Sequence, residues 1–144
     1  MRAHDATLEN FTLGSIRTIL HKGNWAIITA ENPHGQELPA ELNGVLNADL
    51  ECMMHSLNLQ YIPIKGKYGG NEEHSFIVVG INRGIALELC EAYEQESVLI
   101  PNGLLYPSGK IVPALSITLW DTAIPEDYYS ILPDGTCFTI NLDF

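Results

Sequence analysis

The sequence is poor in basic residues, since seven lysines and arginines stand against eighteen aspartates and glutamates, a formal net charge of −11. Proteins that bind nucleic acid through its phosphates need clustered positive charge, so a nucleic-acid partner is not expected. The acidic surplus leaves three interpretations: solubility, attraction of a cationic ligand, or imitation of a polyanion such as DNA. The acidic residues are scattered rather than gathered in one run, which weakens the case for DNA mimicry.

Long apolar runs are also missing. None approaches the ~20 residues that a membrane-spanning helix needs, and residues 1–11 contain no apolar stretch of the kind that directs secretion. Hydrophobic residues still make up 46% of the 144-residue chain, enough to form a core without disulfides or metals. We therefore expect one cytoplasmic domain over residues 1–144, with no membrane partner.

Motifs for metals, cofactors and nucleophiles are absent too. Cys52, Cys90 and Cys137 form no CxxC pair and are expected to be reduced and mostly buried thiols. The five histidines show no HxH or HExxH spacing, and the chain has no GxSxG elbow. The glycines of residues 66–70 fit neither a Walker loop nor a GxGxxG motif. Neither a metal nor a cofactor is expected.

What the sequence does contain is an alternation of strand and helix patterns. Short apolar runs predict strands, and apolar residues spaced by three and four predict helices. The strands are expected at 25–30, 59–64, 75–81 and 96–100, and the helices at 40–57 and after Asn82 to Tyr93. The order βαββαβ predicts an α+β, ferredoxin-like sandwich.

The remaining segments are expected to flank this domain. Residues 1–24 are predicted to form an N-terminal arm, containing a short strand pair or a helical turn. Residues 101–144 are predicted to be a C-terminal β extension, with a hairpin formed by 104–106 and 111–120 and a last strand at 137–142. The helix at 40–57 is expected to bury an apolar face made of Leu42, Leu46, Leu50, Met53, Met54 and Leu57.

The stretch from Gly66 to Gly80 is the strongest candidate for a binding edge. A glycine-rich turn leads through Glu72 and Glu73 into an apolar strand, and such junctions of loop and strand often carry binding groups. Adjacent strand residues point to opposite faces, so only one glutamate is expected to face a site. The alternative interpretation is that both are ordinary solvated loop acids. Tyr68 would offer an aromatic face to a cation.

A second acidic segment, Glu94-Gln95-Glu96, follows the second predicted helix. Negative charge at a helix C-terminus opposes the helix dipole. Such a locally unfavourable choice sometimes marks a functional site, although acids at helix ends are also common on protein surfaces. Both interpretations remain open at this point.

Several short motifs, taken in order, resemble the small bacteriophage S-adenosylmethionine lyases, long called S-adenosylmethionine hydrolases. Together they cover roughly residues 25–140. They are Ile28-Thr29-Ala30, Gly66-x-Tyr68, Glu72-Glu73-x-Ser75, Tyr93-Glu94-Gln95-Glu96-Ser97-Val98-Leu99, Gly103-Leu104-Leu105-Tyr106 and Cys137-Phe138-Thr139-Ile140. The Thr29-Ala30-x-Asn32-Pro33 and Glu73-x-Ser75-Phe76 motifs also resemble an uncharacterised bacterial domain family.

The lyase resemblance implies a homotrimer of ferredoxin-like subunits, similar to the PII signalling proteins, with active sites between subunits. It implies cleavage of S-adenosylmethionine to 5′-methylthioadenosine and L-homoserine lactone, without a cofactor, as the carboxylate of the substrate displaces the sulfonium. The bound substrate needs only to be held bent, with its carboxylate near the γ-carbon. For a phage protein, this activity would deplete the methyl donor of the host and so oppose restriction.

The same resemblance assigns roles to residues. Glu73 matches the functional glutamate, with Glu72 as the neighbouring candidate, and Tyr68 matches the tyrosine of the turn. The loop between Tyr68 and the glutamates is shorter than in the family, so Tyr61 is the alternative for the role of the tyrosine. The expected substrate-binding residues are Tyr61, Ser75, Glu94 and Gln95. The alternative function is a non-catalytic anti-defence or regulatory protein that binds a nucleotide or mimics DNA.

Overall fold

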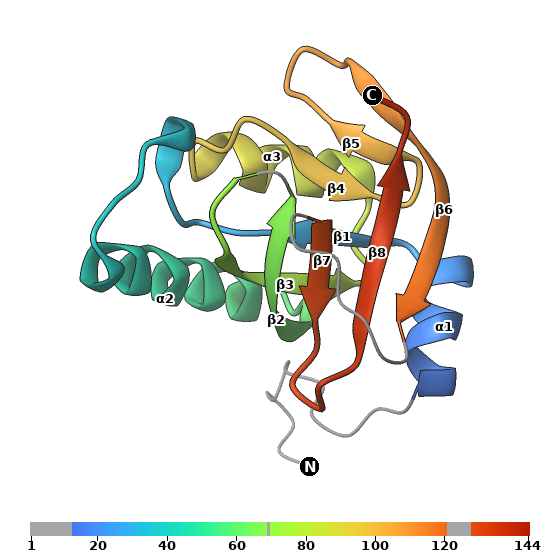
Figure 1. The fold of residues 1–144 in the computed structure, drawn as a ribbon. Helices are drawn as coiled ribbons and strands as arrows, with labels where there is room; N and C mark the ends of the chain where they lie inside the picture. The colour runs from blue at the N-terminus through green and yellow to red at the C-terminus, as the bar shows by residue number, and fades with distance from the viewer. Residues whose placement is uncertain (1–12, 69, 121–127) are drawn as a thin grey trace.

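The computed structural model describes residues 13–68, 70–120 and 128–144 (Figure 1). The described chain forms helices and strands in an order that begins with a helix and ends with five consecutive strands. They are α1 (Leu13–Lys22), β1 (Trp25–Ile28), η1 (Pro33–Gly35), α2 (Ala40–Ser56), β2 (Gln60–Tyr68), β3 (Glu73–Val79), α3 (Arg83–Ala92), β4 (Val98–Ile100), β5 (Gly103–Leu105), β6 (Ile111–Trp120), β7 (Tyr128–Ile131) and β8 (Cys137–Leu142).

The strands form a closed antiparallel barrel with the order β1-β3-β2-β7-β8-β6-β5-β4, and β4 returns to β1 through the pair Ile27 and Leu99. The predicted ferredoxin-like (PII-like) sandwich is therefore wrong. The strands after residue 100 do not extend a sheet, because β7 pairs with β2 and β5 pairs with β4. The paired strands β6 and β8 then connect these two sides. Closure leaves no open sheet edge.

The local elements were predicted better than the architecture. From β1 to β4 the chain follows the predicted order of strands and helices, and β2 and β3 form the predicted hairpin, with Gly66 paired to Glu73. The predicted helix cap is present, since Oδ1 of Asn82 accepts a hydrogen bond from the Ile85 N–H at 2.8 Å. The hairpin of β5 and β6 and the last strand β8 are also found.

The strands bury side chains on both faces, which creates two cores. Successive strand residues point to opposite sides. Ala26, Phe76 and Val78 contribute to a core with α2 and α3, whereas Ile77 and Phe138 contribute to a second core that includes residues of α1. Figure 1 shows α2 and α3 flanking β1 and β3, with α1 at the opposite side of the molecule.

Helix α1 lies within residues 1–24, which were predicted to form an arm with a short strand pair or a helical turn, and it belongs to the second core. Its residues Ile16 and Leu20 are buried, and the Leu20 carbonyl accepts a hydrogen bond from Nε1 of Trp25 at 3.0 Å. Trp25 begins β1, so this bond fixes the end of the helix to the barrel. The first twelve residues of the predicted arm lie outside the described residues.

Helix α2 has the predicted extent, and its predicted buried face is confirmed in part: Leu50 and Met54 are buried, and Leu46 packs against the same core. Leu42, Met53 and Leu57 were predicted to be buried, yet they are 52%, 40% and 45% exposed. Asn43 and Asn47 are buried instead. None of the described helices is long and apolar enough to cross a membrane.

Two of the three cysteines are expected to be unreactive in the folded protein. Cys90 and Cys137 are buried, whereas Cys52 is exposed, and all three are free thiols. Burial, reinforced by the charge of Glu91, raises the pKa of Cys90 to about 11, and burial also raises the pKa of Cys137. A thiol must ionise to react. We expect Ellman's reagent at pH 8 to titrate one thiol per native chain rapidly, and all three after denaturation. Cys52→Ser should abolish the rapid phase, and a rapid phase that persists in this variant would contradict the assignment.

Candidate functional site

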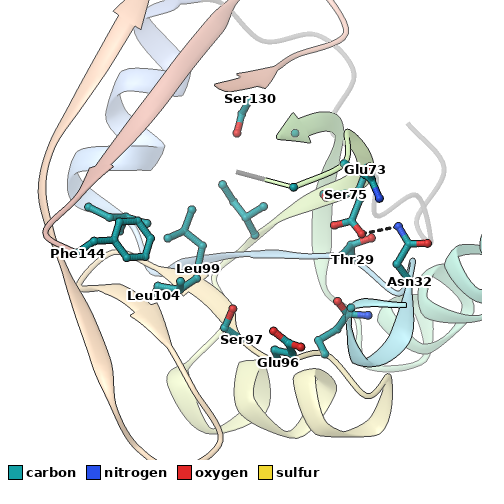
Figure 2. Close-up of a pocket in the computed structure, with 17 residues that line it drawn as sticks. Thr29, Asn32, Glu73, Ser75, Glu96, Ser97, Leu99, Leu104, Ser130 and Phe144 are labelled. Carbon is teal, nitrogen blue, oxygen red and sulfur yellow. Dashed lines mark hydrogen bonds between the residues drawn. The ribbon is translucent and has the colours of Figure 1, made fainter. Parts of the chain in front are cut away.

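A cavity of about 360 Å³ opens among the loops around β1, β3 and β4 (Figure 2). We call it the mouth cavity. It has a polar side and an apolar side. The polar side is formed by Thr29, Asn32, Asn71, Glu73, Ser75, Gln95, Glu96, Ser97 and Ser130, and the apolar side by Ile27, Leu99, Leu104, Leu142 and Phe144. Its volume lies at the lower end of the range for small-molecule sites, ~300–1,000 Å³.

Glu73 is the central acidic group of the polar side. It begins β3 and is half-buried, and its Oε2 accepts a hydrogen bond from Nδ2 of Asn32 at 2.8 Å. Burial raises the pKa of Glu73, the hydrogen bond from Asn32 lowers it, and the charge of Glu31 raises it further, so the net shift is upward. A carboxyl group with a raised pKa in a cavity is a candidate for binding or acid–base chemistry.

The loop after β1 holds Asn32 in an uncommon conformation. Asn32, His34 and Gly35 have φ angles of 51°, 58° and 72°, in the left-handed region that most residues avoid. The loop is held in this conformation partly by α2, because Oδ1 of Asn43 accepts the N–H of Asn32 at 2.9 Å. Asn47 supports the start of the same loop in the same way, since its Oδ1 accepts the N–H of Ala30 at 2.9 Å.

The same loop is joined directly to β3. The buried Glu31 accepts a hydrogen bond from the N–H of His74 at 2.9 Å. The carbonyl of His74 accepts hydrogen bonds from Oγ1 of Thr29 at 2.7 Å and from Nδ2 of Asn47 at 3.0 Å. The backbone on the C-terminal side of Glu73 is therefore fixed by three side chains. This rigidity is expected to hold the Glu73 carboxylate in place at the cavity.

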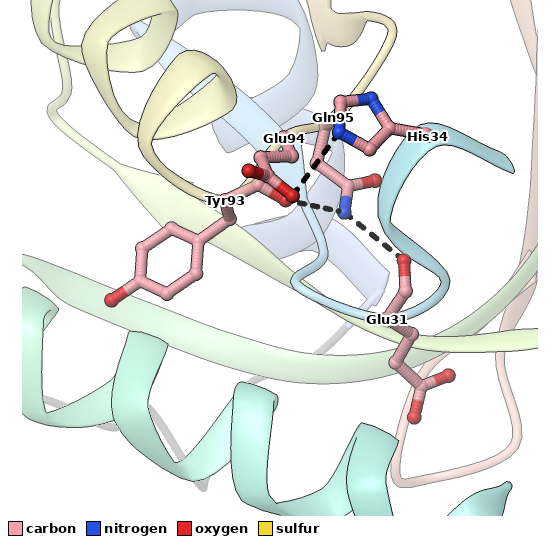
Figure 3. A network of polar contacts seen from close by, with 5 residues as sticks. All are labelled: Glu31, His34, Tyr93, Glu94 and Gln95. Carbon is pink, nitrogen blue, oxygen red and sulfur yellow. Dashed lines mark hydrogen bonds and ion pairs between the residues drawn. The ribbon is translucent and has the colours of Figure 1, made fainter. Parts of the chain in front are cut away.

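The segment after α3 forms the opposite wall (Figure 3). Nε2 of Gln95 donates hydrogen bonds to the carbonyls of Glu31 at 3.0 Å and Tyr93 at 3.2 Å. Glu94 has a φ of 55° and forms an exposed ion pair with Nε2 of His34 at 3.2 Å. These contacts dock the loop after β1 onto the loop before β4, so both loops contribute to one cavity.

Glu96 lies next to this docked segment and lines the cavity. A Cβ atom added at Gly35 would lie 3.1 Å from Oε1 of Glu96, so the glycine leaves room for the carboxylate. Figure 2 shows Glu96 and Glu73 on different walls of the cavity. The site thus presents carboxylates from two separate elements.

The charge of the mouth cavity favours a cationic ligand. Glu73 and Glu96 are acidic, and none of the described residues that line the cavity is a lysine, arginine or histidine. Within the described residues, no three His, Cys, Asp or Glu side chains are grouped so that they could hold a metal ion. An organic cation with an apolar part would match both the carboxylates and the apolar side.

The structure brings three of the predicted site residues together. Glu73, Ser75 and Gln95 all line the mouth cavity. Of the neighbouring glutamates it is Glu73 that faces the cavity, whereas Glu72 is exposed and accepts a hydrogen bond from the Tyr129 hydroxyl. The side chain of Tyr68 lies outside the described part of the structure.

Two other predicted residues lie elsewhere. The hydroxyl of Tyr61 contacts α2, 2.9 Å from Oε2 of Glu51 and 3.0 Å from Nε2 of His55, in the core outside the cavity. Glu94 forms its ion pair at the surface and does not line the cavity. Neither is placed to touch a ligand bound there.

Sequence reasoning missed Asn32, Glu96 and Ser97 as site residues. Asn32 stands in the Thr-Ala-x-Asn-Pro motif, which was noted only as a resemblance. Glu96 and Ser97 belong to the motif from Tyr93 to Leu99. The predicted site residues of this motif were Glu94 and Gln95, which precede them. The position of Glu96 and Ser97 at the cavity is a property of the folded chain, and no spacing in the sequence specifies it.

Comparisons with known proteins indicate a family without a known activity. Residues 28–98 match the model of a family described as "Protein of unknown function (DUF3293)". The match covers just under half of the chain and includes Asn32, Glu73, Ser75 and Glu96. No curated protein matches the sequence. The chain is thus similar to this family over the segment that supplies most of the polar side of the cavity.

Proposed function

We propose that the chain binds S-adenosylmethionine in the mouth cavity and cleaves it to 5′-methylthioadenosine and L-homoserine lactone. The observation that carries the proposal is the Glu73 carboxylate, held by Asn32 in a cavity whose described lining has no basic residue. S-adenosylmethionine carries an ammonium on its amino-acid part and a sulfonium that joins this part to an adenosyl group. An acidic chain of net charge −11 would also attract this cation.

The proposed reaction is an internal displacement. A carboxylate oxygen of the substrate forms a bond to its own γ-carbon, while the electron pair of the carbon–sulfur bond moves to sulfur and leaves a neutral thioether. No proton is transferred, so the protein needs to bind and bend the substrate rather than supply a nucleophile. Any cost of bending is met by binding the parts of the substrate that do not react.

Each side of the cavity has a role in this proposal. Glu73 binds the substrate ammonium, and Glu96 lies toward the sulfonium from the other wall. Leu99, Leu104 and Phe144 offer the apolar surface for the adenosyl group. The homotrimer stays a prediction, together with the cytoplasmic location and the depletion of a host methyl donor.

The test is incubation of the purified full chain with S-adenosylmethionine, followed by chromatography and NMR of the products. Methylthioadenosine and homoserine lactone are expected. Glu73→Gln should lower kcat/KM by about 100-fold, because it removes a charge that contacts the substrate. Glu88→Gln is the matched control, since Glu88 is exposed on α3 and does not line the cavity. Absence of product from the wild type would reject the reaction, and equal rates in the wild type and Glu73→Gln would reject the site.

A second candidate is binding of the same kind of cation without cleavage. The barrel fold favours this second candidate, because the lyase resemblance implies ferredoxin-like subunits instead. Calorimetric binding of S-adenosylmethionine with unchanged ligand recovered afterwards would support this candidate. A nucleotide bound through its phosphates fits less well, because the described lining offers phosphates no positive charge.

A further inference from the structure

We propose that Asn43 is a positioning residue that acts through Asn32 to orient the Glu73 carboxylate, so that Oε1 is the oxygen that meets the ligand and carries the proton when Glu73 is neutral. The identity of the ligand rests on the proposed function. The orientation of Glu73 does not, because it follows from the hydrogen bonds of three buried or half-buried side chains.

The first step is the orientation of the Asn32 amide. Its Oδ1 lies 2.9 Å from the N–H of Leu38 and 2.9 Å from Nδ2 of Asn43. Both groups are donors, so the atom between them must be the amide oxygen. The amide nitrogen of Asn32 is then directed to Oε2 of Glu73 at 2.8 Å. Asn32 therefore presents a donor to the carboxylate, and a flipped amide would place two oxygens against each other.

The second step is the orientation of Asn43 itself. Its Oδ1 accepts the N–H of Asn32 at 2.9 Å, and its Nδ2 lies 3.3 Å from the carbonyl of Leu38 in addition to Oδ1 of Asn32. The oxygen of the Asn43 amide therefore meets only a donor, and its nitrogen meets only acceptors. Asn32 is 8% exposed and Asn43 is 6% exposed, so water cannot readily replace these partners.

The consequence concerns the two oxygens of Glu73. The Nδ2 group of Asn32 can only donate, so Oε2 must accept in both protonation states. A proton on Glu73 is therefore carried by Oε1, and the same atom is left for the ammonium of a ligand. Asn43 does not line the mouth cavity, which separates its positioning role from direct contact with the ligand.

Several titratable groups lie near Glu73 along the chain, on the paired strand or across the cavity. Glu31 raises the pKa of Glu73 through its charge, and Glu96 lies across the cavity. Glu72 and His74 are its neighbours along the chain, and Lys65 and Lys67 lie on the paired strand β2. These groups remain when Asn43 is replaced, so a change in the titration of Glu73 would report the loss of the hydrogen bonds that run from Asn43 through Asn32.

The experiment compares the full wild-type chain with Asn43→Ala. Glutamate side-chain carboxyl shifts are followed by ¹³C NMR against pH, and Glu73→Gln identifies the Glu73 signal. We expect Asn43→Ala to raise the pKa of Glu73, because Asn32 no longer holds a donor against the carboxylate. For turnover of S-adenosylmethionine, the ratio of kcat/KM at pH 6 to that at pH 8.5 should be lower in Asn43→Ala than in the wild type.

The control is Asn82→Ala, which removes an asparagine that caps α3 away from Glu73. It lowers stability by a comparable mechanism and should leave the Glu73 titration unchanged. Asn43→Ser, whose shorter hydroxyl cannot reach both groups of Asn32, should shift Glu73 in the same direction if Asn43→Ala does not fold. An unchanged Glu73 titration in the Asn43 variants would overturn the proposal. Absence of turnover in the wild type would reject the proposed reaction while leaving the NMR result valid.

Discussion

Replacement of Gly103 by alanine is expected to remove most of the stability of the barrel. Gly103 begins β5 with a φ of 140°, where a side chain is strongly disfavoured. An added Cβ would overlap the carbonyl oxygen of Val112 and lie 2.9 Å from the nitrogen of Ala114. Both atoms belong to the backbone of β6, so neither can move without breaking the pairing of β5 with β6.

We expect a loss of about 4 kcal/mol or more in the free energy of unfolding, which is a large part of the ~5–15 kcal/mol typical of a domain. Urea unfolding followed by the fluorescence of the buried Trp25 would measure it. Gly109→Ala is the matched control, because Gly109 also has a positive φ of 93° but nothing lies within 4 Å of an added Cβ. Similar losses of unfolding free energy in the two variants would mean that the backbone conformation, and not the contact with β6, causes the effect at Gly103.

Replacement of Glu73 by glutamine is expected to stabilise the protein while it impairs the cavity. Burial and the charge of Glu31 raise the pKa of Glu73 above its value in the unfolded chain, despite the hydrogen bond from Asn32. Between the two pKa values the folded protein binds more protons than the unfolded one, so stability falls as pH rises through this window. Above the folded pKa the full cost of the buried charge is present.

Glutamine removes this cost, and its side-chain oxygen can still accept the hydrogen bond of Asn32. At pH 7–8 we expect the melting temperature of Glu73→Gln to exceed that of the wild type by about 2–4 °C. The difference should shrink as pH falls toward 4, where the unfolded carboxyl also becomes protonated. Circular dichroism melts at several pH values measure both effects.

Glu72→Gln is the control for this experiment. Glu72 is the neighbouring residue, but it is exposed, and it raises the pKa of Tyr129 to about 12 chiefly by accepting the hydrogen bond of the phenol. Its replacement should change stability by less than about 0.5 kcal/mol. A melting temperature of Glu73→Gln below that of the wild type at neutral pH would mean that the ionised carboxylate stabilises the fold.

Local patterns predicted the elements of this fold but not its closure. The apolar runs of β1, β2 and β3 and the cap at Asn82 are encoded within a few residues of each element. Closure depends on pairs such as Tyr68 with Tyr128 and Gly103 with Pro113, and no local periodicity specifies which edges meet. The order βαββαβ is compatible with both an open sandwich and this barrel, so the C-terminal strands decide between them.

Part of the buried face of α2 was predicted incorrectly, for a different reason: Leu46, Leu50 and Met54 meet the core as predicted, but three other residues do not. Hydrophobic spacing selected Leu42, Met53 and Leu57, yet the helix turns Asn43 and Asn47 inward. These two side chains bind backbone groups of the loop after β1 and of β3. Such buried backbone groups need partners, and the loss of a partner costs about 1–3 kcal/mol. The two asparagines therefore share the buried face of the helix with Leu50 and Met54.

Most of the polar side of the mouth cavity comes from the first part of the chain, and most of its apolar side comes from the later part. Glu73, Asn32 and Glu96 lie within the segment that matches the family, whereas Leu104, Leu142 and Phe144 come after it. This division makes the site modular. Proteins that keep the first segment and vary the closing strands would retain the same charged group while selecting molecules of different shape. Exchange of β5 to β8 between such proteins would then transfer ligand preference without transferring reactivity.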